Sequence, residues 1–224
     1  VTPAYILEEV TGQAADKGNS TAGIVTSGRL ASVIEEDRLG PWVFKDGELS
    51  ETPAPQALGQ FRARDVSIKG ANAVDHNGNI GVLAADAGGG TVGGIWGTLT
   101  ARGSHWVAPV SLERLVPDVI EAAKVCGNHL WDLTMGQAAG LMPIVNAQVV
   151  TEIQALELLT GVPAPHVASG GVAGSEGAVI LSLSGEESVV REAFSLLEAI
   201  KGEEQFEAPR LIPYIREPEA APQR

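Results

Sequence analysis

The chain has 224 residues, of which 44% are hydrophobic and 4% aromatic, so it can bury a sizeable core built from Val, Ile, Leu and Ala. Its formal net charge of −13 argues against nucleic acid and anionic membranes as partners. A small anionic ligand is still compatible with this charge, because helix N-termini carry local positive potential.

The cysteine and histidine content limits the chemistry further. Cys126 is the single cysteine, which excludes an internal disulfide and a multi-cysteine zinc site and fits a reducing compartment. The histidines show no metal-ligand spacing, and nothing in the sequence indicates a cofactor. No stretch approaches the ~20 apolar residues of a membrane span, and no signal peptide is visible. We therefore expect a cytoplasmic protein with no membrane partner.

The first half of the chain alternates between predicted helices and predicted strands. Thr2 and Pro3 are typical of a helix start and Gly12 of a helix end. The elements expected next are a strand over 21–26, a helix over 30–37, strands over 42–44, 66–68 and 81–85, a helix over 91–102, a strand over 106–110 and a helix over 112–125 interrupted near Pro117. This alternation predicts an α/β domain with a mostly parallel, Rossmann-like sheet covered by helices.

The order of elements changes near Gly140. We expect a strand over 143–150, a helix over 151–160, strands over 166–169 and 178–183, a helix over 186–200 and a strand over 206–211. The order β-α-β-β-α-β is that of a ferredoxin-like unit. The predicted domains are therefore an α/β domain over 1–139, a smaller ferredoxin-like α+β domain over 140–212 and a mobile polar tail over 213–224. Because ferredoxin-like units often pair edge to edge, we also expect a homo-oligomer.

Four loops stand where α/β sheets bind ligands, after strands or at helix starts. The loop over 69–79 is the richest in polar side chains, and its Lys69 and Asp75 are the candidate catalytic residues. The candidate ligand-binding residues of the four loops are Thr2; Thr26, Ser27 and Gly28; Gly70, Asn72 and Asn79; and Gly88, Gly89, Gly90 and Thr91. Two plainer interpretations stay open, namely that Asp75 serves a turn and that Lys69 is a solvated surface lysine.

The order of these motifs resembles that of the ribose-5-phosphate isomerases. Ile24-Val-Thr-Ser, Gly70-Ala-Asn-Ala-Val-Asp and Ala87-Gly-Gly-Gly-Thr resemble successive motifs of that family, over residues 1 to about 125. The second of these also resembles the lactate-utilisation domains and the CoA transferases, which share the fold. The resemblance implies an isomerase/CoA transferase-like domain whose ligand is a sugar phosphate, an organic acid or an acyl-CoA.

The departures from the family concern its chemistry. The isomerases use an acid pair where this chain has Asn72 and Ala73, and neither of these side chains can act as a general base. The transferases use a Glu nucleophile that has no counterpart here. The sequence therefore predicts a protein that binds a small anionic metabolite, with an isomerase or transferase activity left open. The alternative is a non-catalytic sensor or assembly protein that associates through its C-terminal domain.

Overall fold

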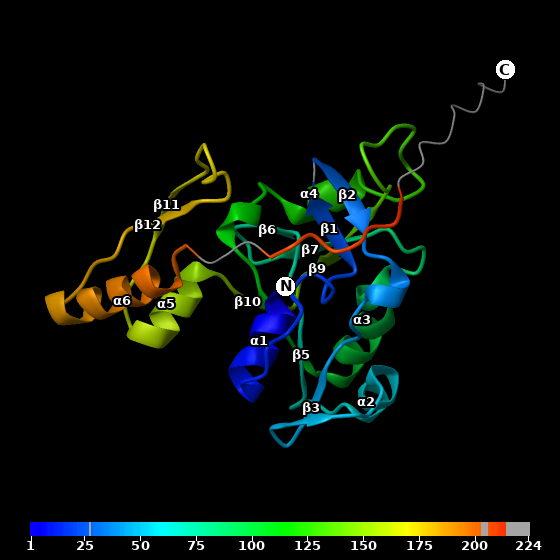
Figure 1. Cartoon of the computed structure of the whole chain (residues 1–224), viewed down its shortest axis with the longest axis horizontal. Coiled ribbons are helices and arrows are strands. Elements are labelled where there is room, and N and C mark those ends of the chain that lie inside the picture. The colour runs from blue at the N-terminus through cyan, green and yellow to red at the C-terminus, as the bar shows by residue number, and fades with distance from the viewer. Residues whose placement is uncertain (27, 203–205, 214–224) are drawn as a thin grey trace.

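A computed structural model describes residues 1–26, 28–202 and 206–213, and these form a mixed α/β structure (Figure 1). The helices are α1 (Thr2–Thr11), α2 (Ala54–Gln60), α3 (Gly90–Arg102), α4 (Val119–Lys124), α5 (Glu152–Thr160) and α6 (Glu187–Ile200). The strands are β1 (Gly23–Thr26), β2 (Arg29–Ser32), β3 (Val43–Lys45), β4 (Glu48–Ser50), β5 (Val66–Ile68), β6 (Ala73–Val74), β7 (Ile80–Ala84), β8 (His105–Pro109), β9 (Gly140–Ile144), β10 (Gln148–Val150), β11 (His166–Ser169) and β12 (Val179–Leu181). Within the described ranges, no helix is long and apolar enough to cross a bilayer.

Local sequence signals explain the predicted helices that the structure confirms. Helix α1 has Pro3 in its first turn and ends at Gly12, whose φ of 69° is left-handed and costs glycine little. Helix α5 begins after Thr151, whose Oγ1 accepts from the amide of Ile153 at 3.3 Å while Gln154 Oε1 accepts from the amide of Thr151 at 2.9 Å. Helices α3 and α6 also form over the predicted residues.

Two three-stranded sheets form the centre of the molecule. Strands β5 and β10 pair in parallel with opposite edges of β8, whereas β6 and β9 pair antiparallel with opposite edges of β7. Side chains from both sheets and from α3 enclose one core, whose fully buried members include Ile80, Leu99 and Ile144. The carboxyl ends of β5 and β8 therefore meet at one edge of the parallel sheet.

The prediction of a mostly parallel sheet is not confirmed. Among the described residues, two strand pairings are parallel and five are antiparallel. For β1–β2 and β3–β4 the short connection is the reason, because a turn of two residues can only join antiparallel strands. The predicted helix over 30–37 is wrong for the same reason: Gly28, with a φ of 73°, turns the chain so that β2 pairs with β1, and only a 3₁₀ turn over Glu35–Asp37 follows.

The second half also differs from the predicted ferredoxin-like order. The predicted strand over 143–150 is two strands, of which β9 joins β7 and β10 joins β8, so the pairing crosses the predicted boundary after residue 139. The ferredoxin-like sheet is therefore not confirmed. The predicted strand over 206–211 is a single bridge between Leu211 and Val33. The predicted tail lies outside the described residues beyond residue 213.

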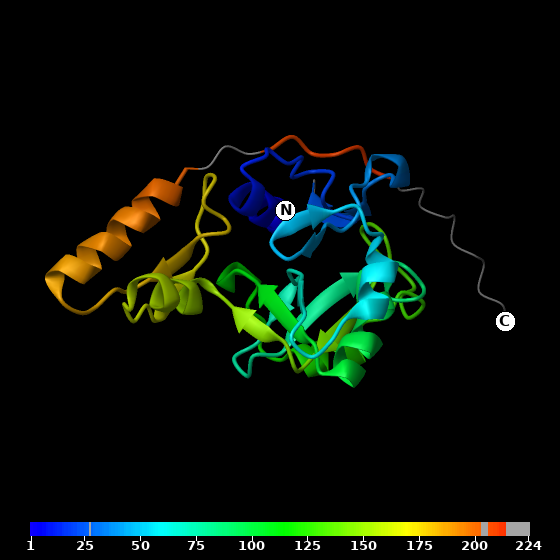
Figure 2. The same ribbon diagram turned by 90° about the horizontal axis from the view of Figure 1, so that it is seen from below.

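A separate projection carries the remaining elements. Residues 152–200, here called the arm, contain α5, the antiparallel hairpin β11–β12 and α6. Figures 1 and 2 both show the arm extending from one side of the body that the two central sheets form. Helices α5 and α6 pack together, and Ala193 of α6 is fully buried.

Candidate anion-binding site

Lys69 lies at the carboxyl end of the parallel sheet. Its amide donates to the carbonyl of Val107 at 3.1 Å, so the pairing of β5 with β8 continues one residue beyond Ile68. The chain then turns through Gly70, where a Cβ would lie 3.4 Å from the carbonyl oxygen of Pro109 and 3.5 Å from Oγ1 of Thr2. The loop therefore passes between the end of β8 and the first turn of α1, which brings Thr2 and Gly70 together as predicted.

The ammonium group of Lys69 has no counter-ion in the described part of the chain. No carboxylate lies within ion-pair distance of its Nζ, and no hydrogen bond to Nζ is formed there. The side chain is partly buried, and this burial lowers the pKa of Lys69 below its ordinary value. Burying a charge is costly unless a partner compensates it, so this is a position of unsatisfied positive potential.

A second cation, Arg114, lies close to the same point. It is the last residue of the 3₁₀ turn Leu112–Arg114 after β8; its Nη1 donates to the carbonyl of Ala71, and its Nε donates to Glu113 Oε1 at 3.3 Å. Burial, and then the charges of Lys69 and Arg114, lower the pKa of the Val1 α-amino group to about 6. Both cations therefore act on the start of α1. Sequence reasoning missed Arg114, although it follows the end of β8 much as Lys69 follows β5.

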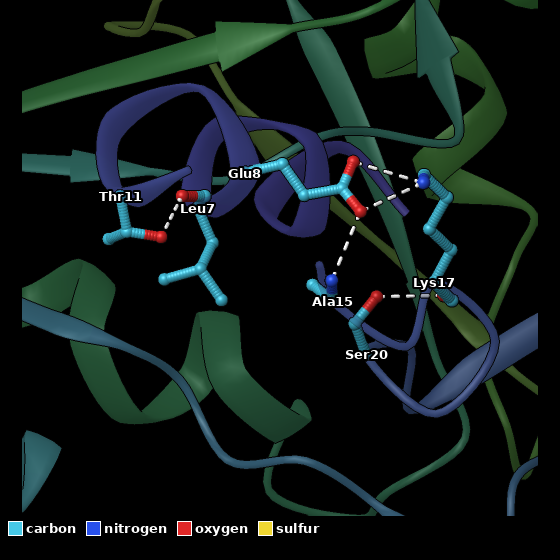
Figure 3. Close-up of polar contacts among 6 residues, drawn as sticks. All are labelled: Leu7, Glu8, Thr11, Ala15, Lys17 and Ser20. Carbon is cyan, nitrogen blue, oxygen red and sulfur yellow. Dashed lines mark hydrogen bonds and ion pairs between the residues drawn. The ribbon is translucent and has the colours of Figure 1, made fainter. Parts of the chain in front are cut away.

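A hollow of about 500 Å³ runs along α1 from this point, lined by Thr2, Tyr5, Ile6, Glu8, Glu9 and Pro109. Two of these residues, Thr2 and Pro109, also flank Gly70. Glu8 does not bring a free negative charge to the hollow, because its carboxylate bonds Lys17 Nζ and the amide of Ala15, each at 3.0 Å (Figure 3). Lys17 also lies over the ring of Tyr5, with 4.6 Å between Nζ and the ring centroid.

Asp75 is buried and fully engaged within the protein. Its Oδ1 accepts from the amides of Asn77 and Asn79 at 2.9 and 3.0 Å, and its Oδ2 accepts from Asn79 Nδ2 and from the amide of Val119, both at 3.0 Å. Burial raises the pKa of Asp75, but these hydrogen bonds outweigh burial and hold the pKa below its ordinary value. Four bonds use the four acceptor positions of a carboxylate, so Asp75 holds the turn and the start of α4 in place.

The two predicted asparagines also make internal bonds. Asn79 donates to Asp75. The amide of Asn72 donates to the carbonyl of Gly81, and Asn72 Oδ1 accepts from the amide of Leu83, both in strand β7. These contacts fix the path of the loop after Gly70. Within this loop, Lys69 and Gly70 therefore face α1, while Asn72 and Asn79 serve the β6–β7 region.

The glycine cluster before α3 binds a carboxylate of the chain itself. Asp86 Oδ1 accepts from the amides of Gly88 and Gly90 at 2.8 and 3.0 Å, and the Asp86 carbonyl accepts from Gly89 at 3.0 Å. The predicted anion cradle is thus occupied by the carboxylate of Asp86. The sequence indicates this turn, because an Asp stands two and four residues before glycines. Thr91 follows, exposed, in the first turn of α3. The cluster packs on β9, because a Cβ at Gly89 would lie 3.0 Å from Met142 Cε.

The second predicted loop lies elsewhere. Thr26 and Gly28 belong to the hairpin turn between β1 and β2, and Ser27 lies outside the described residues. In Figure 1 this hairpin turns at the top of the molecule, whereas α1 begins near its centre. The structure therefore joins Thr2, Lys69 and Gly70 into one site, to which it adds Arg114, and it does not bring Thr26 and Gly28 into that site.

No family model, no curated protein and no solved structure matches this chain. The resemblance to the isomerase and CoA transferase superfamily accordingly stays a prediction. Among the described residues, no group of three or more His, Cys, Asp and Glu side chains lies close enough together to hold a metal ion. The arrangement around Lys69 has the chemistry of a monoanion or phosphate site: one uncompensated ammonium, a nearby guanidinium and a helix start.

Proposed function

We propose that this protein binds a small anionic metabolite at Lys69, with Arg114 and Thr2 beside it. The observation that carries the proposal is the partly buried ammonium of Lys69, for which the described residues supply no counter-ion. An anion that enters here compensates a charge that the folded protein has already desolvated. The ligand classes that fit are a sugar phosphate, an organic acid or an acyl-CoA.

The adjoining hollow supports a ligand larger than a bare anion. The hollow begins at Thr2 and Pro109 beside Gly70 and continues along α1 past Tyr5. A phosphate or carboxylate at Lys69 would leave the rest of the ligand against this helix face. Glu9, at the far end, is a hydrogen-bond acceptor for hydroxyl groups. A polyhydroxylated anion therefore makes contacts at both ends of the hollow.

The proposal is one of binding and does not include the isomerase reaction. Asn72 and Ala73 stand where the acid pair of that family stands, and the Asp75 carboxylate already accepts four internal hydrogen bonds. A carboxylate in this state can take a substrate proton only by giving up a bond that holds the turn. We therefore assign Asp75 a structural role and leave Lys69 as the residue that meets the ligand.

Thermal unfolding in the presence of anions tests the proposal. Inorganic phosphate, ribose 5-phosphate, citrate and acetyl-CoA are added in turn to the wild type, to Lys69→Met and to Lys45→Met. A ligand at about 100 times its Kd stabilises by about 2.7 kcal/mol, which raises Tm by roughly 5–10 °C in a chain of this size. We expect this rise in the wild type and in Lys45→Met, whose lysine is exposed, and no rise in Lys69→Met.

The unliganded variants give an independent prediction. Methionine keeps most of the Lys69 stem and removes its charge, so Lys69→Met is expected to be at least as stable as the wild type without ligand. A variant that loses the ligand response while keeping its stability cannot be explained by misfolding. The proposal is wrong if no anion of the panel stabilises the wild type, or if Lys69→Met responds to the anion as the wild type does.

A further inference from the structure

The arm carries a concentration of exposed apolar side chains. Among the residues that the structure describes, seven large hydrophobic side chains of the arm are about half exposed or more: Leu158, Leu159, Val167, Val172, Ile180, Phe194 and Ile200. They lie on α5, on the β11–β12 hairpin with its loop, and on α6.

The hairpin of the arm has one face that the helices leave bare. Along β12, Val179 and Leu181 are partly buried and Ile180 between them is 49% exposed, as expected when helices cover only one side of a strand. Ala168 lies opposite Ile180 in the register of the hairpin and is also exposed. The face that carries Ile180 and Ala168 is therefore apolar and uncovered.

The outer edge of β12 is also unpaired. In the described part of the chain, β11 and β12 pair only with each other, so each has one open edge. The register of β11 shifts between His166 and Ala168, and a bulge of this kind disfavours pairing along that edge. Strand β12 has no such irregularity and carries neither Lys nor Pro, the residues that usually protect an edge.

The distribution of charge favours a second copy of this chain as the partner. With a formal net charge of −13, two copies repel each other at long range, and this repulsion is weakest for contact surfaces that carry no charge themselves. Strands β11 and β12 contain no Asp, Glu, Lys or Arg; the charges of the arm lie on its helices, in the loop between the two strands at Glu176, and at Glu186 before α6. An open strand edge is complementary to an identical strand about a two-fold axis, which closes the assembly at two copies.

We propose that two chains dimerise through their arms, with β12 pairing antiparallel to β12 of the second copy. The two hairpins then form one four-stranded sheet whose bare faces continue across the axis. This pairing covers both open β12 edges and brings the exposed Ile180 side chains of the two chains together as cross-strand neighbours on one face. It goes beyond the proposed ligand site and does not depend on it, so Lys69→Met is expected to remain dimeric.

Oligomeric state provides the first test. Sedimentation equilibrium of the wild type at micromolar concentration is expected to give twice the mass of the chain. Ile180→Lys is expected to be monomeric with an unchanged circular dichroism spectrum, because residue 180 is exposed in the single chain. Leu133→Lys is the matched control and is expected to stay dimeric: Leu133 is an exposed leucine of the loop between α4 and β9, and Figure 1 shows this loop on the other side of the body from the arm.

Disulfide formation locates the interface without introducing a charged side chain into the arm. In a Cys126→Ser background, Ile180→Cys or Ser182→Cys is expected to give a covalent dimer on mild oxidation, since antiparallel partners at a two-fold axis have Cα atoms about 5 Å apart. Leu133→Cys is expected to stay uncross-linked. A monomeric wild type, a dimer that only Leu133→Lys dissociates, or the absence of cross-links at both 180 and 182 would each overturn the proposal.

Discussion

Gly93→Ala is expected to destabilise the protein by about 4 kcal/mol or more, the range reached by severe steric substitutions. Gly93 lies in the first turns of α3, and a Cβ there would lie 1.7 Å from the carbonyl oxygen of Gly88 and 2.8 Å from its carbon. Both contacts are with backbone, so no side chain can move aside. The turn that Asp86 holds through Gly88 and Gly90 must open instead, and with it the start of α3.

The neighbouring glycine provides the control. Nothing lies within 4 Å of a Cβ built at Gly94, one residue further along the same helix. Gly94→Ala is therefore expected to stabilise the protein by about 0.5–1 kcal/mol, the usual gain for alanine over glycine inside a helix. Urea unfolding of both variants measures the two effects. Equal effects of the same sign at 93 and 94 would show that the close approach of Gly88 to α3 does not occur.

Asp75→Asn is expected to lower the free energy of unfolding by about 3 kcal/mol, which is the order expected when buried donors lose a charged acceptor. An Asn side chain offers one oxygen, so two of the four donors that Asp75 binds would face an amide NH₂ group instead. Asp118→Asn is the control at the same helix, because Asp118 caps α4 through one bond to Glu121 and Asn caps helices equally well. Its expected effect is under about 0.5 kcal/mol.

The pH dependence of this difference follows from the pKa of Asp75. Because that pKa is lower in the folded protein than the ordinary value of about 3.9, the carboxylate stabilises the fold above about pH 4. The stabilisation is lost as the pH falls through the folded pKa. The stability difference between the wild type and Asp75→Asn is therefore expected to be constant from pH 8 to 5 and to shrink below pH 4. A difference that grows on acidification would contradict the assigned hydrogen bonds.

Local signals allowed much of the secondary structure to be predicted. Pro3 and Gly12, or Thr151 with its capping box, mark helix ends by interactions within a few residues, so the sequence alone locates them. The sheet pairings could not be predicted in this way. The run over 143–150 looks like one apolar strand, and only the tertiary structure divides it between β7 and β8.

The candidate site could be predicted only in part, again because local signals are visible in the sequence and long-range contacts are not. Lys69 directly follows strand β5 and therefore lies at the carboxyl edge of the parallel sheet, where ligands and helix starts are found. The order of the elements alone was enough to predict this. The role of Asp75 depends on which donors surround its carboxylate, and these include the amide of Val119, 44 residues away. Arg114 is held near the site by a long-range hydrogen bond to the carbonyl of Ala71, and no sequence motif indicates this bond.

The titration of Lys69 itself tests the central claim most directly. The chain contains five lysines, so the side-chain signals of a ¹³C-lysine-labelled sample can be assigned with Lys69→Met as reference. We predict that the pKa of Lys69 lies below the ordinary value of about 10.4 in the free protein and rises when saturating phosphate or the best anion of the panel is added. A Lys69 pKa at the ordinary value, unchanged by any of these anions, would contradict the proposed site.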